Sequence, residues 1–123
     1  MSSAASPSEI AAGEIALDPA QVAEWRTRDP NLQLIDVRED YERQAGYIEG
    51  SRHIELNHLT AQAATIAADR PVVFYCRIGS RSDMAAQAFR ASGFQAHSLS
   101  GGLVRWAQEG RPLSPEGGHV ADH

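Results

Sequence analysis

The stretch VVFYCRIGSRSDMAAQAF, residues 72–89, decides the fold. It opens with residues that are apolar on both faces, which is typical of a central strand in a parallel sheet. It closes with an alanine-rich run in which Met84, Ala85 and Phe89 share one face at helical spacing. Between the two runs stands the only cysteine of the chain, Cys76. A strand, a short loop and a helix in this order predict one unit of an α/β domain.

The same alternation of strand and helix continues along the chain. Expected strands cover residues 15–17, 32–36, 53–55, 71–75 and 96–99. Expected helices cover residues 20–28, 38–45, 61–69, 82–92 and 102–110. Asp18 before Pro19 is a helix-start signature, and Asn57 or Thr60 is expected to cap the third helix. We therefore expect a central, mostly parallel five-stranded sheet flanked by helices on both faces.

The two ends of the chain differ from its body. Residues 1–14 are small and polar and are expected to form a flexible arm. Residues 114–123 are expected to form a flexible tail, so that 15–113 is the folded domain. His119 and His123 have a spacing that would suit a metal on a helix, but their glycine-flanked setting does not favour one.

Composition narrows the classes of function. The net charge of -5 disfavours a nucleic acid or a membrane surface as partner, because both reward positive charge. Every basic residue counted is arginine, so lysine-based chemistry is absent. One cysteine allows no intrachain disulfide, and no signal segment is evident, so a cytoplasmic protein is expected. We expect neither a cofactor nor a metal.

The loop after the expected strand 71–75 suits an anion. If the helix begins near Ser82, six residues from Cys76 to Arg81 connect the two elements. Gly79 allows backbone N–H groups to turn inward, and Arg77 and Arg81 add positive charge beside a helix N-terminus. The loop therefore suits a cysteine nucleophile that attacks or carries an anionic group. The alternative is that Cys76 is a small buried apolar residue. A cysteine in that role does not require arginine neighbours.

Three motifs in order resemble the rhodanese (sulfurtransferase) family. CRIGSRS, residues 76–82, resembles its active-site loop. LIDVREDYERQAGYIEGSRHIEL, residues 34–56, resembles its N-terminal signature, and GFQAHSLSGGLVRWAQEGRPL, residues 93–113, its C-terminal one. The chain departs from the family at Tyr47, where histidine is frequent, and at Glu55, where proline is frequent.

The resemblance implies a rhodanese-like domain that works through a persulfide. Cys76 would take a sulfur from a small anionic donor such as thiosulfate, and an external thiol, cyanide or a sulfur-carrier protein would remove it. The resemblance makes Cys76 the catalytic residue. It also implies a loop that binds substrate and stabilises the persulfide, made of Arg77, Ile78, Gly79, Ser80, Arg81 and Ser82.

Two alternatives stay open beside sulfur transfer. One is a non-catalytic rhodanese-like module that binds a protein partner. The other is a cysteine phosphatase or arsenate reductase of the same fold. Such relatives carry arginine six positions after the cysteine, whereas Arg81 stands five positions after Cys76. This spacing disfavours phosphoryl chemistry.

Further residues have both a functional and a structural interpretation. Asp36 could orient a loop arginine and Arg38 could anchor the helix 39–45, but a purely structural ion pair is the favoured interpretation. Glu42 is expected on a solvated helix face. No spacing links His53, His58 or His97 to Cys76, so surface or core positions are expected for them.

Overall fold

The computed structural model describes residues 13–122. The expected arm, residues 1–14, therefore lies outside the described residues except for its last two positions. Within the part described, no helix has both the length and the apolar character needed to cross a membrane.

Five strands form one sheet, and each neighbouring pair is parallel. The prediction of a five-stranded sheet in an α/β fold is confirmed. The order is β1-β5-β4-β2-β3, so β4 lies in the middle and all four of its residues are buried. This central position explains why its sequence is apolar on both faces. The strands are β1 (Ala16–Leu17), β2 (Gln33–Asp36), β3 (Arg52–His53), β4 (Val72–Tyr75) and β5 (Ala96–Leu99).

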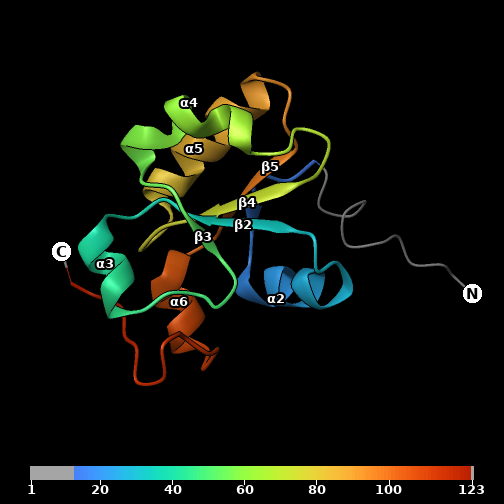
Figure 1. The fold of residues 1–123 in the computed structure, drawn as a ribbon. Coiled ribbons are helices and arrows are strands. Elements are labelled where there is room, and N and C mark those ends of the chain that lie inside the picture. The colour runs from blue at the N-terminus through green and yellow to red at the C-terminus, as the bar shows by residue number, and fades with distance from the viewer. Residues whose placement is uncertain (1–12, 123) are drawn as a thin grey trace, which may run out of the picture.

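Helices cover both faces of this sheet, with α4 and α5 on one side and α2 and α6 on the other (Figure 1). Each side encloses an apolar core. Phe74 and Phe89 belong to the core under α5, and Trp25 and Trp106 belong to the core on the opposite face. The helices are α2 (Pro19–Arg28), α3 (Asp40–Ala45), α4 (Leu59–Gln62), α5 (Ser80–Ala91) and α6 (Gly102–Gln108).

Helix α2 begins where the sequence predicted. The side chain of Asp18 accepts a hydrogen bond from the backbone N–H of Gln21, and the side chain of Gln21 accepts one from the N–H of Asp18. This reciprocal capping box satisfies two amides that the first turn would otherwise leave without partners. Pro19 occupies the first helical position, where its missing N–H costs nothing.

The expected helix 61–69 is wrong in its extent. The structure has the four-residue α4 between two 3₁₀ turns, η1 (Leu56–His58) and η2 (Ala63–Thr65), and no side chain caps α4. Arg52 of β3 explains the early end, because its guanidinium donates to the carbonyl of Thr65 and to the side chain of Gln62. These contacts hold the chain in a turn where the alanine-rich sequence alone favours a helix.

The segment that follows residue 113 contacts the domain, whereas the sequence indicated an untethered tail. Tyr47 and Ser114 form an antiparallel bridge with backbone hydrogen bonds of 2.9 and 2.7 Å. The N–H of His119 donates to the carbonyl of Ala45 at the end of α3. A Cβ atom on Gly46 would lie 2.5 Å from the carbonyl oxygen of His119, so the close approach depends on glycine.

Candidate active site

Cys76 follows directly on β4, at the edge where the carboxyl ends of the parallel strands meet. Helix α5 begins at Ser80, two residues before the expected start at Ser82. The early start depends on Gly79, whose φ of 113° lies in the left-handed region that side chains disfavour. The loop therefore runs only from Cys76 to Gly79, and Arg81 lies in the first turn of the helix.

The sulfur of Cys76 receives a hydrogen bond from the backbone N–H of Gly79 at 3.0 Å. Oγ of Ser82 lies 3.5 Å from the same sulfur and 2.7 Å from Oγ of Ser98 on β5. The exposed fraction of Cys76 is 0%, and the residue packs into the apolar core beneath α5. An amide directed at sulfur and the N-terminal end of a 12-residue helix both stabilise negative charge on that atom.

Arg81 binds the carboxylate of Glu42 with both terminal nitrogens, at 2.8 and 3.0 Å. Glu42 is fully buried, so the expectation of a solvated helix face is wrong. Its hydrogen bond is the largest cause that raises the pKa of Arg81, and the charge of Cys76 acts in the same direction. The pair connects α3 to the first turn of α5, and thereby fixes a guanidinium near the sulfur.

Arg77 points towards the C-terminal segment instead. Its Nε donates to the carbonyl of Ala121 at 3.1 Å, and its guanidinium lies 3.5 Å from the carboxylate of Asp122. The next residue, Ile78, has 56% of its surface exposed although it is large and apolar. The two loop arginines therefore occupy different surroundings, and each contacts a carboxylate.

Helix α6 holds the loop from the other side. The backbone N–H groups of Leu103 and Val104 donate to the carbonyls of Cys76 and Arg77 at 2.9 and 3.0 Å. A Cβ atom on Gly102 would lie 2.3 Å from the carbonyl oxygen of Arg77. Glycine at this position is therefore what lets α6 approach the loop this closely.

The carboxylate of Asp36 pairs with Arg38 rather than with a loop arginine. Both side chains are fully buried, and two nitrogens of Arg38 reach the two carboxylate oxygens at 2.8 and 2.7 Å. Arg38 also donates to the carbonyl of Gly46 at the end of α3. The pair is thus a structural ion pair that anchors α3, the helix that carries Glu42.

Residues 18–109 match the family model described as "Rhodanese-like domain". The chain belongs to this family. Its assignment from three motifs is therefore confirmed, and the motifs of the loop and of the two flanking signatures lie within or overlap the matched range.

Known proteins with similar sequences or folds include named sulfurtransferases of this family. The thiosulfate sulfurtransferase GlpE of Pseudomonas aeruginosa is 35% identical over 89 residues, which cover 72% of this chain and 79% of that protein. A solved rhodanese-related protein from Thermoplasma volcanium has a TM-score of 0.74 at 25% identity, covering 80% of this chain and 96% of that one. A solved protein of unknown function from Rhodopseudomonas palustris, described as a possible tyrosine phosphatase, has a TM-score of 0.72 at 21% identity and covers 93% of this chain and 99% of that one.

The histidines of this rhodanese-like domain have structural contacts away from Cys76. His53 hydrogen-bonds the carbonyl of Arg38 at 2.7 Å, and His58 lies 3.7 Å from the carboxylate of Glu55. His119 lies on the C-terminal segment, while His123 is outside the described residues. Within residues 13–122, no cluster of three or more side chains suited to a metal ion is present.

Two residues at the rhodanese-like site were missed from the sequence, Glu42 and Ser98. Glu42 lies on a short helix that is polar all round, so no apolar stripe marked its buried side. Its spacing from Arg38 and from the cysteine loop carries no signal, because the contact depends on how α3 packs. Ser98 had a weak signal, since it is a hydroxyl within a strand that is buried at every position.

Proposed function

We propose that this rhodanese-like domain is a sulfurtransferase that carries a sulfane sulfur on Cys76. The thiolate of Cys76 attacks the outer sulfur of a small anionic donor such as thiosulfate. The sulfur–sulfur bond of the donor breaks, its electron pair leaves with sulfite, and Cys76 becomes a persulfide. Attack by an acceptor on the outer sulfur then returns the thiolate.

One observation carries the proposal, namely the N–H of Gly79 directed at the sulfur of Cys76 at 3.0 Å. Thiolate and persulfide are both anions, and a backbone amide at a helix N-terminus stabilises an anion without adding a titratable group. Arg81 adds a guanidinium that the carboxylate of Glu42 holds in place and whose charge it partly offsets. The likeness to a thiosulfate sulfurtransferase supports thiosulfate as the donor.

The acceptor is external, because the chain has no second cysteine to resolve the persulfide. A thiol, cyanide or a sulfur-carrier protein has the required nucleophilic atom. A single thiol that must be regenerated in reduced form after each cycle suits the cytoplasm, which we propose as the compartment.

Access to the sulfur requires the loop to move, because the exposed fraction of Cys76 is 0%. The loop is short, and its residue Ile78 has few neighbours to leave since 56% of its surface is exposed. Since α6 holds the carbonyls of Cys76 and Arg77, the movement that admits a donor is expected at Ile78 and Gly79.

Sulfur transfer is favoured over phosphoryl transfer by the engagement of Arg81. A phosphoryl group needs an arginine fork for its oxygens, whereas both terminal nitrogens of Arg81 bind Glu42. The five-position spacing from Cys76 to Arg81 gives a short loop, which fits one sulfur atom better than a tetrahedral oxyanion.

Mass spectrometry of the intact protein tests the proposal. After incubation with thiosulfate, we expect a gain of one sulfur atom that cyanide removes with formation of thiocyanate. The variant Cys76→Ser should show no gain. Absence of the adduct in the wild-type protein would overturn sulfur transfer and leave the non-catalytic binding module. Hydrolysis of an aryl phosphate that depends on Cys76 would instead support a phosphatase.

A further inference from the structure

A cavity lies on the face of the sheet covered by α2 and α6, away from Cys76. Its volume is about 460 Å³, within the range of roughly 300–1,000 Å³ common for small-molecule sites. Leu32 and Leu34 line it from the amino-terminal end of β2, whereas Cys76 follows the carboxyl end of β4. Because the strands are parallel, the cavity lies at the amino-terminal ends of the strands and the sulfur lies at their carboxyl ends.

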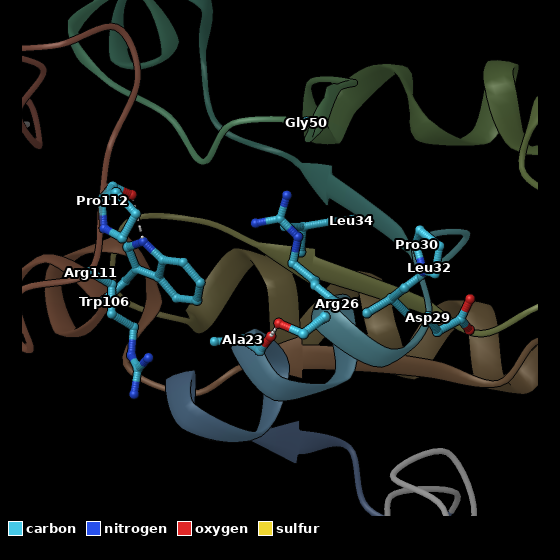
Figure 2. Close-up of a pocket in the computed structure, with 11 residues that line it drawn as sticks. Ala23, Arg26, Asp29, Pro30, Leu32, Leu34, Gly50, Trp106, Arg111 and Pro112 are labelled. Atoms are coloured by element: carbon cyan, nitrogen blue, oxygen red, sulfur yellow. Dashed lines mark hydrogen bonds between the residues drawn. The ribbon is translucent and has the colours of Figure 1, made fainter.

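Arg26 supplies the positive charge of this cavity. One terminal nitrogen donates to the backbone carbonyl of Glu49, and no carboxylate within residues 13–122 forms an ion pair with its guanidinium. The carboxylate of Glu49 accepts a hydrogen bond from Ser114. Figure 2 shows the guanidinium between Trp106 and Leu34. It also shows the carboxylate of Asp29 turned away from Arg26.

Burial makes this charge receptive to an anion. Desolvation is the largest influence on Arg26 and lowers its pKa, against smaller opposing effects of Tyr75 and Glu49. A guanidinium that has lost part of its water, and that feels Glu49 only at a distance without a direct ion pair, interacts favourably with an anion that enters the cavity. The planar fork of arginine also matches the two oxygens of a carboxylate.

The remaining lining residues are mixed, with Thr27 and Asp29 beside the apolar Leu32 and Pro112. Trp106 contributes to the floor of the cavity, where its exposed fraction is 3% and its indole N–H donates to the carbonyl of Pro112 at 2.9 Å. The second cavity arginine, Arg111, is paired with Glu109 at 3.2 Å. One cation without an ion-pair partner in a partly apolar cavity therefore fits a monovalent organic anion better than a phosphate dianion.

We propose that this cavity is a binding site for a small organic carboxylate with an aromatic or apolar body. The carboxylate binds Arg26, and the body packs against Leu32, Pro30 and Pro112, which line the cavity and keep exposed surface. The site is separate from Cys76 and does not depend on the proposed sulfur transfer. Helix α6 links the two places, because its first residues bind the loop carbonyls and Trp106 lies on its last turn.

Nuclear magnetic resonance on the isotopically labelled full chain tests the site with two matched probes. Phenylacetate carries the charge, and phenylacetamide is its neutral analogue of nearly equal shape. We expect phenylacetate to shift the indole resonance of Trp106 and the side-chain Nε resonance of Arg26, and to leave the core residue Trp25 unchanged. Its affinity should exceed that of the amide by about tenfold or more, as for a hydrogen bond to a charged group.

Matched variants assign the preference to one charge. Arg26→Gln should remove the preference for the acid, and Arg26→Lys should keep part of it. Arg28→Gln removes a charge from an exposed position of the same helix and should change nothing. Equal affinity of the two probes, no shift of Trp106 at millimolar probe, or the same loss in Arg28→Gln would overturn the proposal. If Arg26→Gln does not fold, the comparison of phenylacetate with phenylacetamide on the wild-type chain still shows whether the site prefers an anion. Unchanged binding in Cys76→Ser is expected, and its loss would contradict a separate site.

Discussion

At the scale of single residues, the pair of Glu42 and Arg81 is asymmetric in its surroundings. The side chain of Glu42 is 0% exposed and that of Arg81 is 20% exposed. A charge left alone in the interior costs far more than one that can reach water. The two partners therefore differ in what their removal does to stability, although they make one and the same contact.

Replacement of the two partners should reveal this asymmetry. Arg81→Leu leaves the buried carboxylate without its arginine, and we expect the free energy of unfolding to fall by about 3–5 kcal/mol. Glu42→Gln leaves a guanidinium that can reach water, so its loss should be smaller. Urea denaturation of both variants at neutral pH measures the difference. Equal losses, or a larger loss in Glu42→Gln, would contradict the burial argument.

His97 should contribute to the pH dependence of stability. Its ring is buried, contacts Arg90 and Gln95, and lies edge-on to Trp25. Burial lowers its pKa from the ordinary value of 6.5 and outweighs the hydrogen bond to the carbonyl of Glu14, which raises it, while the charge of Arg90 acts in the same direction as burial. The folded protein therefore binds this proton less readily than the unfolded chain. The contribution is fully present above the unfolded pKa and is lost as the pH falls towards the folded one.

Denaturation profiles between about pH 5 and pH 7 measure this effect, since a histidine changes its charge in that range. We expect the wild-type protein to lose stability on acidification more steeply than His97→Gln, which cannot titrate. Parallel profiles for the two proteins would show that other groups account for the whole dependence.

The sequence predicts Cys76 and its arginines as site residues because they are neighbours in one short stretch. It does not identify Glu42, since the contact with Arg81 spans 39 positions and depends on the packing of α3. A side chain that acts through tertiary contact leaves no trace in local spacing.

At the scale of elements, the start of α5 determines the geometry at the sulfur. Gly79 has a φ of 113°, and a Cβ atom there would meet no atom closer than 3.6 Å. Substitution is therefore limited by backbone conformation and not by crowding. Gly93, at the other end of the same helix, has a φ of 95° with no atom within 4 Å of a Cβ position.

The variants Gly79→Ala and Gly93→Ala form a matched pair. Each should lower the free energy of unfolding by about 1–3 kcal/mol, because alanine disfavours a positive φ. Only Gly79→Ala should also slow persulfide formation, since it moves the N–H that donates to Cys76. Rates of sulfur loading followed by mass spectrometry, with stability measured alongside, separate the two effects. An equal fall in rate for Gly93→Ala would argue for a general effect of stability.

Periodicity locates the elements well where a buried face repeats. It places Ala85 and Phe89 correctly in the core, but its prediction that Met84 shares their face is wrong, because Met84 is 60% exposed. The observed helix boundaries differ from the predicted ones where a single backbone conformation or a distant side chain determines where the helix begins or ends. Gly79 starts α5 two residues early, and Arg52 ends the helical run near Thr65.

At the scale of the whole molecule, the C-terminal segment brings the carboxylate of Asp122 and the carbonyl of Ala121 to Arg77. An anionic donor that approaches the loop meets this arginine already in contact with negative atoms. Removal of the segment would leave Arg77 free to attract the donor.

Deletion of residues 119–123 should therefore lower the KM for thiosulfate, with the larger gain at low ionic strength. Asp122→Asn should give a smaller change, because an exposed ion pair contributes only about 0–1 kcal/mol. Steady-state kinetics with cyanide as acceptor at two salt concentrations measure both variants. An unchanged or raised KM in the truncated protein would contradict an electrostatic role of the segment.

The sheet could be predicted from the alternation of segments, because each strand and helix carries its own pattern. The placement of the C-terminal segment could not, since its contacts use backbone atoms of Ser114, His119 and Ala121. Every residue has such atoms, so the side-chain sequence gives no pattern to recognise. The close approach at Gly46 is visible only once the segment is in place.

The hold of α6 on the carbonyls of Cys76 and Arg77 has a consequence for the neighbouring peptide groups. In a trans peptide, C=O and N–H point in opposite directions across a rigid plane. With both oxygens turned to α6, the amide hydrogens of the following residues face away from that helix, and neither oxygen is free to swing towards an incoming anion. A side chain at Gly102 would push α6 away and free both peptide groups at once. A residue far along the chain therefore determines whether a sulfur donor meets amide hydrogens or carbonyl oxygens.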